Sequence, residues 1–399
     1  MSSIRIRRMS RPVVALVLTI SCVCWTFLVG FLFSQTSTTT LLYHRARASE
    51  VTRPWNVTVL SRVSPCRPQH RIVYIKTHKT GSSTVTNILE RYGYLRGLNF
   101  ALPKALSFSA TKKFDPSQVY LNYLKDGNGS SIWPALGGFH LVVNHLRYNR
   151  KELEATIPNA VYVTIIREPA SQFLSAMCYY KLGSQGKAKS MADTLDIALA
   201  DPEKYLNVFA RNGHAYDLGM DPASFSDPVA VNKTIESLSR ELDLVMITEY
   251  FDESLILLKK LLCCDFEDIL YIAKGVGKGC ASRNITSDAR EKIRRLNHVD
   301  VKLYQHFNRT FWDKVRDYGP TFQQDLRSFR EIKEANTEMC LTGASERIDG
   351  HSAVVLRVGK NASEKCNNLF REDVQWVSIL KRYMQNKSST FVKGIDKRH

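Results

Sequence analysis

A cluster of cationic and hydroxyl side chains follows directly after the apolar run IVYI, within the sequence RIVYIKTHKTGSST of residues 71–84. A short loop that leaves a buried strand and enters a helix presents free backbone N–H groups, which attract phosphate or sulfate. Lys79, just before the single glycine Gly81, adds a positive charge to such a loop. The stretch therefore predicts an oxyanion site, made by Lys76, Thr77, His78, Lys79, Thr80, Gly81, Ser82 and Ser83.

The order of residues in this loop differs from that in the phosphate loop of nucleoside triphosphatases. That motif, G-x-x-x-x-G-K-[ST], places its lysine after the second glycine, whereas Lys79 precedes the only glycine of the stretch, Gly81. A loop that is polar only because it is exposed is the simpler alternative. The apolar run before the loop favours a binding loop, as does the helical pattern SSTVTNILERYG after it, which we expect Gly93 to end.

Four short apolar runs, each followed by a helical pattern, indicate the fold class. They are residues 72–75, 139–143, 160–166 and 242–248. Continuous apolar strands that alternate with helices predict an α/β fold with a central parallel sheet flanked by helices. Ligands of such sheets bind at the carboxyl ends of the strands, where the loop described above begins. From about residue 287 the sequence becomes helical.

The N-terminal residues predict a membrane anchor. Residues 12–33 carry no charge and are long enough, at about 1.5 Å per residue, to cross a hydrocarbon layer of about 30 Å. Arginines in residues 1–11 are expected to keep that tail cytoplasmic. The chain then reads as a type II membrane protein with a stem at 34–69 and a luminal domain at 70–399. A cleaved signal peptide is the alternative, although its apolar core is usually shorter.

Sequons and cysteines agree with a luminal location. The N-x-S/T sequons all follow the apolar segment and begin at Asn56, Asn128, Asn232, Asn284, Asn308, Asn361 and Asn386. An odd number of cysteines lies beyond the apolar segment, so at least one is unpaired or bridges two chains. Cys340 and Cys366 flank a loop and are the first disulfide that we expect. No cysteine or histidine spacing suggests zinc, and no metal is expected.

The formal net charge of +18 suits an acidic membrane surface, a nucleic acid or a multiply charged small anion. A basic surface that only keeps the protein soluble would explain part of this charge as well. Because the charge is expected to lie on a luminal domain, we do not expect a nucleic-acid partner.

Two linked motifs resemble the donor site of sulfotransferases. The stretch KTGSST resembles the loop that holds the 5′-phosphosulfate of 3′-phosphoadenosine 5′-phosphosulfate (PAPS). In that superfamily the 3′-phosphate is bound by an arginine at the end of a later strand and a serine eight residues on. Arg167 ends the run YVTII, and Ser175 lies eight residues beyond it. The resemblance implies a P-loop-like sulfotransferase fold with PAPS as donor; an ordinary ion-pair arginine beside Glu168 is the alternative.

The closer resemblance is to the galactose 3-O-sulfotransferases, the family of galactosylceramide (cerebroside) sulfotransferase. It rests on IKTHKTGSSTVTNIL, NHLRYN, TIIREPASQFLSAMCYY, TEYFDESLILLKKLL and LYQHFNRTFW, and runs from about residue 70 to the C-terminus. One departure is Gly81, which stands where we expect alanine in the family. The resemblance implies a Golgi membrane enzyme that sulfates the 3-hydroxyl of terminal β-galactose on glycolipids or glycoprotein glycans. It leaves a homodimer open.

The chemistry of sulfuryl transfer assigns further roles. A cation must stabilise the charge that develops on the leaving phosphate oxygen, and a base must accept the proton of the attacking hydroxyl. We expect Lys79 to be the cation and His145, just past the run FHLVV, to be the base, with His78 as its competitor. Arg147 is expected to contact the acceptor or the sulfate, and Glu249 is expected to contact the acceptor.

Two other functions remain open from the sequence. A uronyl 2-O-sulfotransferase acting on a glycosaminoglycan has a similar loop, but it reads PKT where this chain has His78. A non-catalytic membrane protein that binds anionic glycans would use the positive charge. Such a protein would have no use for the spacing of Arg167 and Ser175.

Overall fold

The computed structural model describes residues 66–120, 136–183, 191–273, 285–341, 345–348, 354–359 and 361–396. The expected tail, membrane span and most of the stem lie outside these residues, as do the sequons at Asn56, Asn128 and Asn284. Within the part of the chain that the structure describes, no helix combines the length and apolar character needed to cross a membrane.

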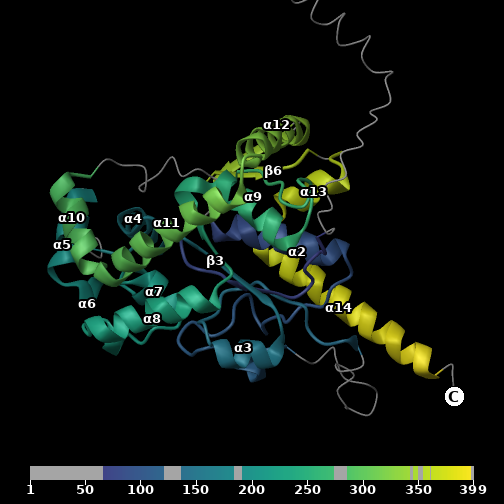
Figure 1. Cartoon of the computed structure of the whole chain (residues 1–399), viewed down its shortest axis with the longest axis horizontal. Coiled ribbons are helices and arrows are strands. Elements are labelled where there is room, and N and C mark those ends of the chain that lie inside the picture. The colour runs from purple at the N-terminus through teal and green to yellow at the C-terminus, as the bar shows by residue number, and fades with distance from the viewer. Residues whose placement is uncertain are drawn as a thin grey trace, which may run out of the picture. The chain divides into compact units, whose positions relative to one another are not determined.

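A four-stranded parallel sheet lies at the centre of the described residues (Figure 1). Its strands, in the spatial order β2-β1-β3-β4, are β1 (Ile72–Ile75), β2 (Leu141–Val142), β3 (Val161–Ile166) and β4 (Leu244–Ile247). Every strand residue except Val161 is buried, as expected for a sheet that is covered on both faces. The predicted α/β sheet is therefore confirmed, and the four apolar runs supply its strands.

Helices surround this sheet and make up most of the C-terminal part. They are α2 (Ser82–Leu95), α3 (Arg150–Thr156), α4 (Pro169–Tyr180), α5 (Met191–Ala200), α6 (Pro202–Tyr205), α7 (Gly213–Asp217), α8 (Pro228–Glu241), α9 (Phe251–Leu262), α10 (Ser287–Leu296), α11 (His298–Tyr318), α12 (Phe322–Leu341), α13 (Glu364–Phe370) and α14 (Asp373–Asp396). Helices α9 and α11 pack against β4, and α14 runs alongside α2 (Figure 1). Helices α4, α5 and α10 enclose a second, smaller apolar cluster around Phe173.

One expectation about the elements was wrong and another was incomplete. Gly93 does not end the helix after the loop, because α2 continues to Leu95. A Cβ atom at Gly93 would lie 2.5 Å from the ring of Phe100, so the glycine serves close packing inside the helix. The part after residue 287 is helical as expected, since α10 begins at Ser287, but it also contains an antiparallel hairpin of β5 (Ser345–Ile348) and β6 (Val354–Arg357), which was not expected. Strands this short carry little periodicity in the sequence.

Disulfides tie distant described segments together. Cys66 is bonded to Cys263 at the end of α9, and Cys340 in α12 is bonded to Cys366 in α13, the pair expected from the sequence. Cys264 is a buried free thiol. Disulfides form and persist in oxidising compartments, so they indicate the secretory pathway.

The described sequons differ in exposure. Asn232 on α8, Asn361 shortly before α13 and Asn386 on α14 are exposed at the surface. Asn308 lies in the middle of α11, and its amide oxygen is buried without a hydrogen-bond partner among the described residues. Glycosylation stays a prediction at each of them, and the three exposed asparagines are the more accessible positions.

Candidate functional site

The loop between β1 and α2 adopts an uncommon backbone conformation. Lys79 has a φ of 65° and Gly81 a φ of 74°, both in the left-handed region. For a residue other than glycine this conformation costs about 1–3 kcal/mol, and such residues cluster at functional sites. Alanine at position 81, which we expected for the family, would carry the same strain, so glycine suits this turn better.

Hydroxyl groups hold the loop against the sheet. Thr77 Oγ1 donates to the carbonyl oxygen of Ile165 in β3. Thr248, directly after β4, donates to the carbonyl oxygen of Thr80 at 2.8 Å, and Ser82 Oγ donates to that of Thr77 at 2.6 Å. Thr77, Thr80 and Ser82 are buried, so these expected donor-binding hydroxyls fix the shape of the loop.

An uncapped helix end and a cation meet at this loop. Gly81, the N-cap residue of α2, makes no side-chain cap, and the first turn of α2 contains no acidic residue. The first N–H groups of a helix have no acceptor within it, and the helix dipole favours an anion there. The Lys79 ammonium lies 3.6 Å from the ring centroid of Tyr179, a cation–π contact that keeps the positive charge beside the loop. These groups fit a phosphate or sulfate ester.

Lys76 and Ser83, also expected to bind the donor, contact a carboxylate of α14. The ammonium of Lys76 forms an ion pair with Asp373, and Ser83 Oγ donates to Asp373 Oδ2 at 3.0 Å. The side chain of Lys76 is only 3% exposed, so its charge is paired inside the protein and is not presented to solvent.

Two histidine rings stack beside the loop. The ring centroids of His78 and His145 are 4.0 Å apart, with an angle of 13° between the planes. His145 Nδ1 donates to the carbonyl oxygen of Lys76 at 2.9 Å, which leaves Nε2 with its lone pair. Burial of the ring, together with the nearby charges of Lys76 and Lys79, lowers the pKa of His145 well below its usual 6.5. His145 is therefore neutral at pH 7 and can accept a proton.

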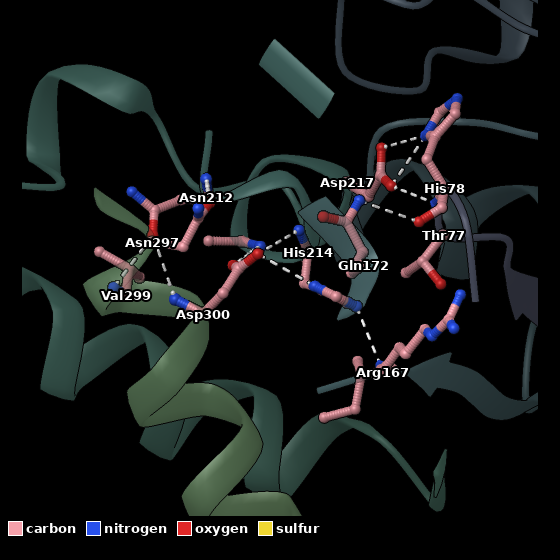
Figure 2. Close-up of polar contacts among 12 residues, drawn as sticks. Thr77, His78, Arg167, Gln172, Asn212, His214, Asp217, Asn297, Val299 and Asp300 are labelled. Atoms are coloured by element: carbon pink, nitrogen blue, oxygen red, sulfur yellow. Dashed lines mark hydrogen bonds and ion pairs between the residues drawn. The ribbon is translucent and has the colours of Figure 1, made fainter. Parts of the chain in front are cut away.

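A buried carboxylate orients His78. Asp217, at the end of α7, accepts a hydrogen bond from the backbone N–H of His78 at 2.8 Å and lies 2.9 Å from its Nδ1 (Figure 2). Because a carboxylate only accepts, the proton of the neutral ring lies on Nδ1 and Nε2 is again the acceptor. Phe209 stacks on the His78 ring at 3.7 Å, and Gln172 donates to the His78 carbonyl oxygen at 3.2 Å. His78 thus has the geometry of an alternative base.

A small pocket of about 60 Å³ opens beside the two imidazoles. His78, His145, Arg147 and Asp217 line it, together with residues 107–110. An acceptor hydroxyl that enters this pocket would approach both rings. Among the described residues, no cluster of His, Cys, Asp and Glu side chains is arranged to hold a metal ion.

Arg147 reaches the pocket but is largely engaged by the protein. Its guanidinium donates to the carbonyl oxygens of Thr111 at 2.8 Å, Tyr216 at 3.3 Å and Met220 at 3.1 Å. It also lies over the ring of Tyr216, 3.9 Å from the centroid. These contacts hold the wall of the pocket, and the expected contact of Arg147 with an acceptor stays a prediction.

Arg167 follows β3 and reaches the donor loop from the neighbouring strand. Its Nη1 donates to the carbonyl oxygen of Lys79 at 3.3 Å. Its backbone N–H donates to Nε2 of the buried His214, whose Nδ1 donates to Asp300, both at 3.0 Å (Figure 2). Burial lowers the pKa of Arg167, and the neighbouring carboxylate of Glu249 opposes that shift. Arginine stays charged at pH 7 despite such a shift, so Arg167 supplies a second cation near the loop.

Ser175 and Glu249 lie in elements around Arg167. Ser175 is partly exposed in α4. Glu249 accepts hydrogen bonds from the backbone N–H of Glu168 at 3.1 Å and from the hydroxyl of Tyr304 at 3.3 Å. Glu249 is not among the residues that line the pocket. Its contact with an acceptor therefore stays a prediction.

The carboxylates that hold these groups were not apparent from the sequence. Asp217 lies 139 residues from His78, Asp300 lies 86 residues from His214, and Asp373 lies 290 residues from Ser83. Spacing along the chain gives no signal over such separations. The stretch GHAYD, which places a histidine and an aspartate in one short helix, is a local feature that could have drawn attention.

Comparison with known proteins gives a consistent family. A family model described as galactose-3-O-sulfotransferase matches residues 2–355. Galactosylceramide sulfotransferase of Bos taurus is 33% identical over 288 residues, which are 70% of this chain and 66% of that protein, just under two thirds of its length. Galactose-3-O-sulfotransferase 3 of Bos taurus is 33% identical over 358 residues, 81% of each chain. The Homo sapiens protein of that name is 37% identical over 292 residues, 70% of this chain and 65% of the relative.

Proposed function

Because the chain belongs to the galactose-3-O-sulfotransferase family, we propose that it transfers a sulfuryl group from PAPS to the 3-hydroxyl of a terminal β-galactose. The observation that carries this proposal is the loop between β1 and α2, where an uncapped helix end, Lys79 and Arg167 come together. Family membership favours a galactose acceptor over a uronic acid. It gives no support to a non-catalytic glycan-binding protein.

The acceptor class within this proposal is a galactose-terminated glycolipid or glycoprotein glycan. One set of relatives is named for galactosylceramide and another for galactose alone, and this chain is 33% identical to a bovine member of each. The disulfides support a secretory-pathway location. Within that pathway we propose the Golgi membrane and a single-pass type II topology, which the uncharged segment at residues 12–33 predicts.

Two parts of the site would hold the donor. The N–H groups at the start of α2 and the Lys79 ammonium would bind the phosphosulfate end. Arg167, with Ser175 two helical turns further on, would bind the 3′-phosphate. PAPS supplies an activated sulfuryl group, which leaves the 5′-phosphate oxygen when the acceptor hydroxyl attacks sulfur.

The protein itself supplies a cation for the leaving group and a base for the attacking hydroxyl. Lys79 stabilises the negative charge that develops on the departing phosphate oxygen. Nε2 of His145 accepts the proton of the galactose hydroxyl, since its Nδ1 is already committed to the Lys76 carbonyl oxygen. The hydrogen bond from Arg167 to the Lys79 carbonyl oxygen connects the two ends of the donor site.

Replacing Arg167 with alanine should abolish recognition of the 3′-phosphate. We expect the wild-type chain to bind 3′,5′-bisphosphorylated adenosine more tightly than adenosine 5′-phosphate, because a charge-assisted contact is worth about 1.5–3 kcal/mol. Arg167→Ala should bring the two affinities to within a few-fold of each other. Titration calorimetry on the full-length chain measures both, and equal affinities in the wild type would show that the 3′-phosphate is not read.

The product tests the proposed function directly. The full-length chain would be given radiolabelled PAPS with galactosylceramide, lactosylceramide, N-acetyllactosamine, a mucin-type core and desulfated heparan. We expect label on at least one galactoside and none on the heparan. Labelled heparan would move the enzyme to the glycosaminoglycan class.

The position of the sulfate is then read with periodate, which cleaves between adjacent free hydroxyls. A terminal galactose sulfated at O3 keeps free hydroxyls only at carbons 2, 4 and 6, so it should survive. Sulfation at O6 leaves carbons 2, 3 and 4 free, and the ring would be cleaved. Periodate-sensitive labelled galactose would therefore overturn the assignment of the 3-hydroxyl.

A further inference from the structure

One carboxylate joins the two ends of the loop between β1 and α2. Asp373, the first residue of α14, forms an ion pair with Lys76 and accepts a hydrogen bond from Ser83 Oγ at 3.0 Å. Lys76 directly follows the last residue of β1, and Ser83 is the second residue of α2. The strained turn that carries Lys79 lies between these two anchored residues.

Burial makes the ion pair a structural requirement. The Lys76 side chain is 3% exposed and that of Asp373 is 31% exposed. An ammonium taken out of water needs a partner, and removal of that partner leaves an uncompensated buried charge. The Lys76 ion pair therefore fixes the start of the loop on its buried side. The backbone oxygen of Lys76 also accepts the hydrogen bond from His145.

The helix that carries Asp373 is firmly attached to α2. Trp376, one turn into α14, is fully buried. Asn87 of α2 donates to the carbonyl oxygen of Arg371 at 3.0 Å, just before α14 begins. Further along, Lys387 donates to the carbonyl oxygen of Gly97 at 2.7 Å, so α14 follows α2 along its length (Figure 1). These contacts hold the first turn of α14, which carries Asp373, beside the start of α2.

We propose that Asp373 is a positioning residue for donor binding, which clamps both ends of the loop so that Lys79 and the N–H groups of α2 face the donor. The inference rests on the proposed function. The matched family model ends at residue 355, so α14 lies beyond the part of the chain that the match describes. The C-terminal segment thus contributes to a site that is formed by residues near the start of the domain.

The direction in which Asp373→Asn changes the affinity for the donor distinguishes two roles of the carboxylate: holding the loop in place, or competing with the donor for the anion site. A carboxylate that merely occupied the anion site would repel the donor, so Asp373→Asn would tighten donor binding. A clamp predicts the reverse, because the loop loses its anchor. We expect Asp373→Asn to raise the KM for PAPS by about tenfold, as for loss of one charge-assisted hydrogen bond. The KM for the galactoside should stay within about twofold.

The experiment compares variants of the full-length chain by donor KM, affinity for 3′,5′-bisphosphorylated adenosine, and Tm. Asp268→Asn is the matched control, since Asp268 pairs with Arg96 at the other end of α2, at 2.8 Å. It should cost stability without changing the donor KM. An Asp373→Asn chain whose donor KM is unchanged or lower would overturn the clamp.

A double variant covers the case in which Asp373→Asn folds poorly. Lys76→Met with Asp373→Leu removes both charges, so the Tm should recover, because no ammonium is left unpaired. The donor KM should stay raised, because leucine at position 373 offers no acceptor to Ser83 Oγ. Recovery of both quantities would reduce Asp373 to a stabilising residue and overturn the proposal. A wild-type chain that binds no bisphosphorylated nucleotide would overturn the proposed function itself and the clamp with it.

Discussion

Replacing Lys79 with alanine is expected to lower kcat by about 10²- to 10³-fold, the usual cost of removing one charge-stabilising group from a transition state. Lys79 belongs to the loop that precedes the uncapped start of α2, where the departing phosphate oxygen would carry its charge, and its ammonium lies over the ring of Tyr179. Alanine shares the left-handed strain that lysine has at this φ of 65°, so the backbone should not gain or lose from the change. The measurement is sulfuryl transfer from radiolabelled PAPS at saturating donor and acceptor.

A surface lysine provides the control for this variant. Lys302 on α11 is exposed, and Lys302→Ala removes the same charge without touching the loop. We expect its kcat to stay within about twofold of wild type, as for other surface substitutions. A Lys79→Ala enzyme that keeps more than a tenth of the wild-type kcat, with a normal Tm, would contradict the mechanism.

The central sheet could be predicted because its signal is local. Each of its strands is an uninterrupted apolar run, since a parallel strand covered on both faces has no polar side. The C-terminal hairpin could not be predicted in the same way. Its strands are four residues each and follow a long helix, so neither length nor alternation distinguishes them. The glycine at position 93 inside α2 is explained by the close approach of Phe100, a contact that only the folded chain makes.

The same distinction applies to the site. The donor loop is one continuous stretch, so its residue types could be recognised together. The groups that orient it come from other helices: Asp217 from α7 behind His78, Asp300 from α11 behind His214, and Asp373 from α14 behind Lys76.

Two of these carboxylates, Asp373 and Asp217, explain how a basic site keeps its shape. Positive groups brought close together repel one another, and each buried one must be paired or lose its charge. Asp373 pairs with the buried Lys76 and Asp217 orients the ring of His78, while the Lys79 ammonium lies over the ring of Tyr179. Positive charge near the donor therefore coexists with a neutral His145.

Replacing His145 with alanine is expected to lower kcat by about 10²- to 10⁴-fold, the usual contribution of a general base. His145 has its Nδ1 proton fixed by the Lys76 carbonyl oxygen at 2.9 Å, and this contact does not depend on Asp217. Asp217→Asn should therefore be the milder change, with a loss of less than about tenfold. The comparison is made with PAPS and the same galactoside for the wild type and both variants.

The pH dependence tests the same assignment. A base acts when it is deprotonated, and burial with the charges of Lys76 and Lys79 lowers the pKa of His145 below 6.5. The acid limb of kcat/KM for the donor, which reports the free enzyme, should therefore lie below pH 6.5. The limb of kcat should lie at higher pH, because a bound polyanion stabilises the protonated ring. If Asp217→Asn costs as much as His145→Ala and also displaces the acid limb, the base is His78, oriented by Asp217.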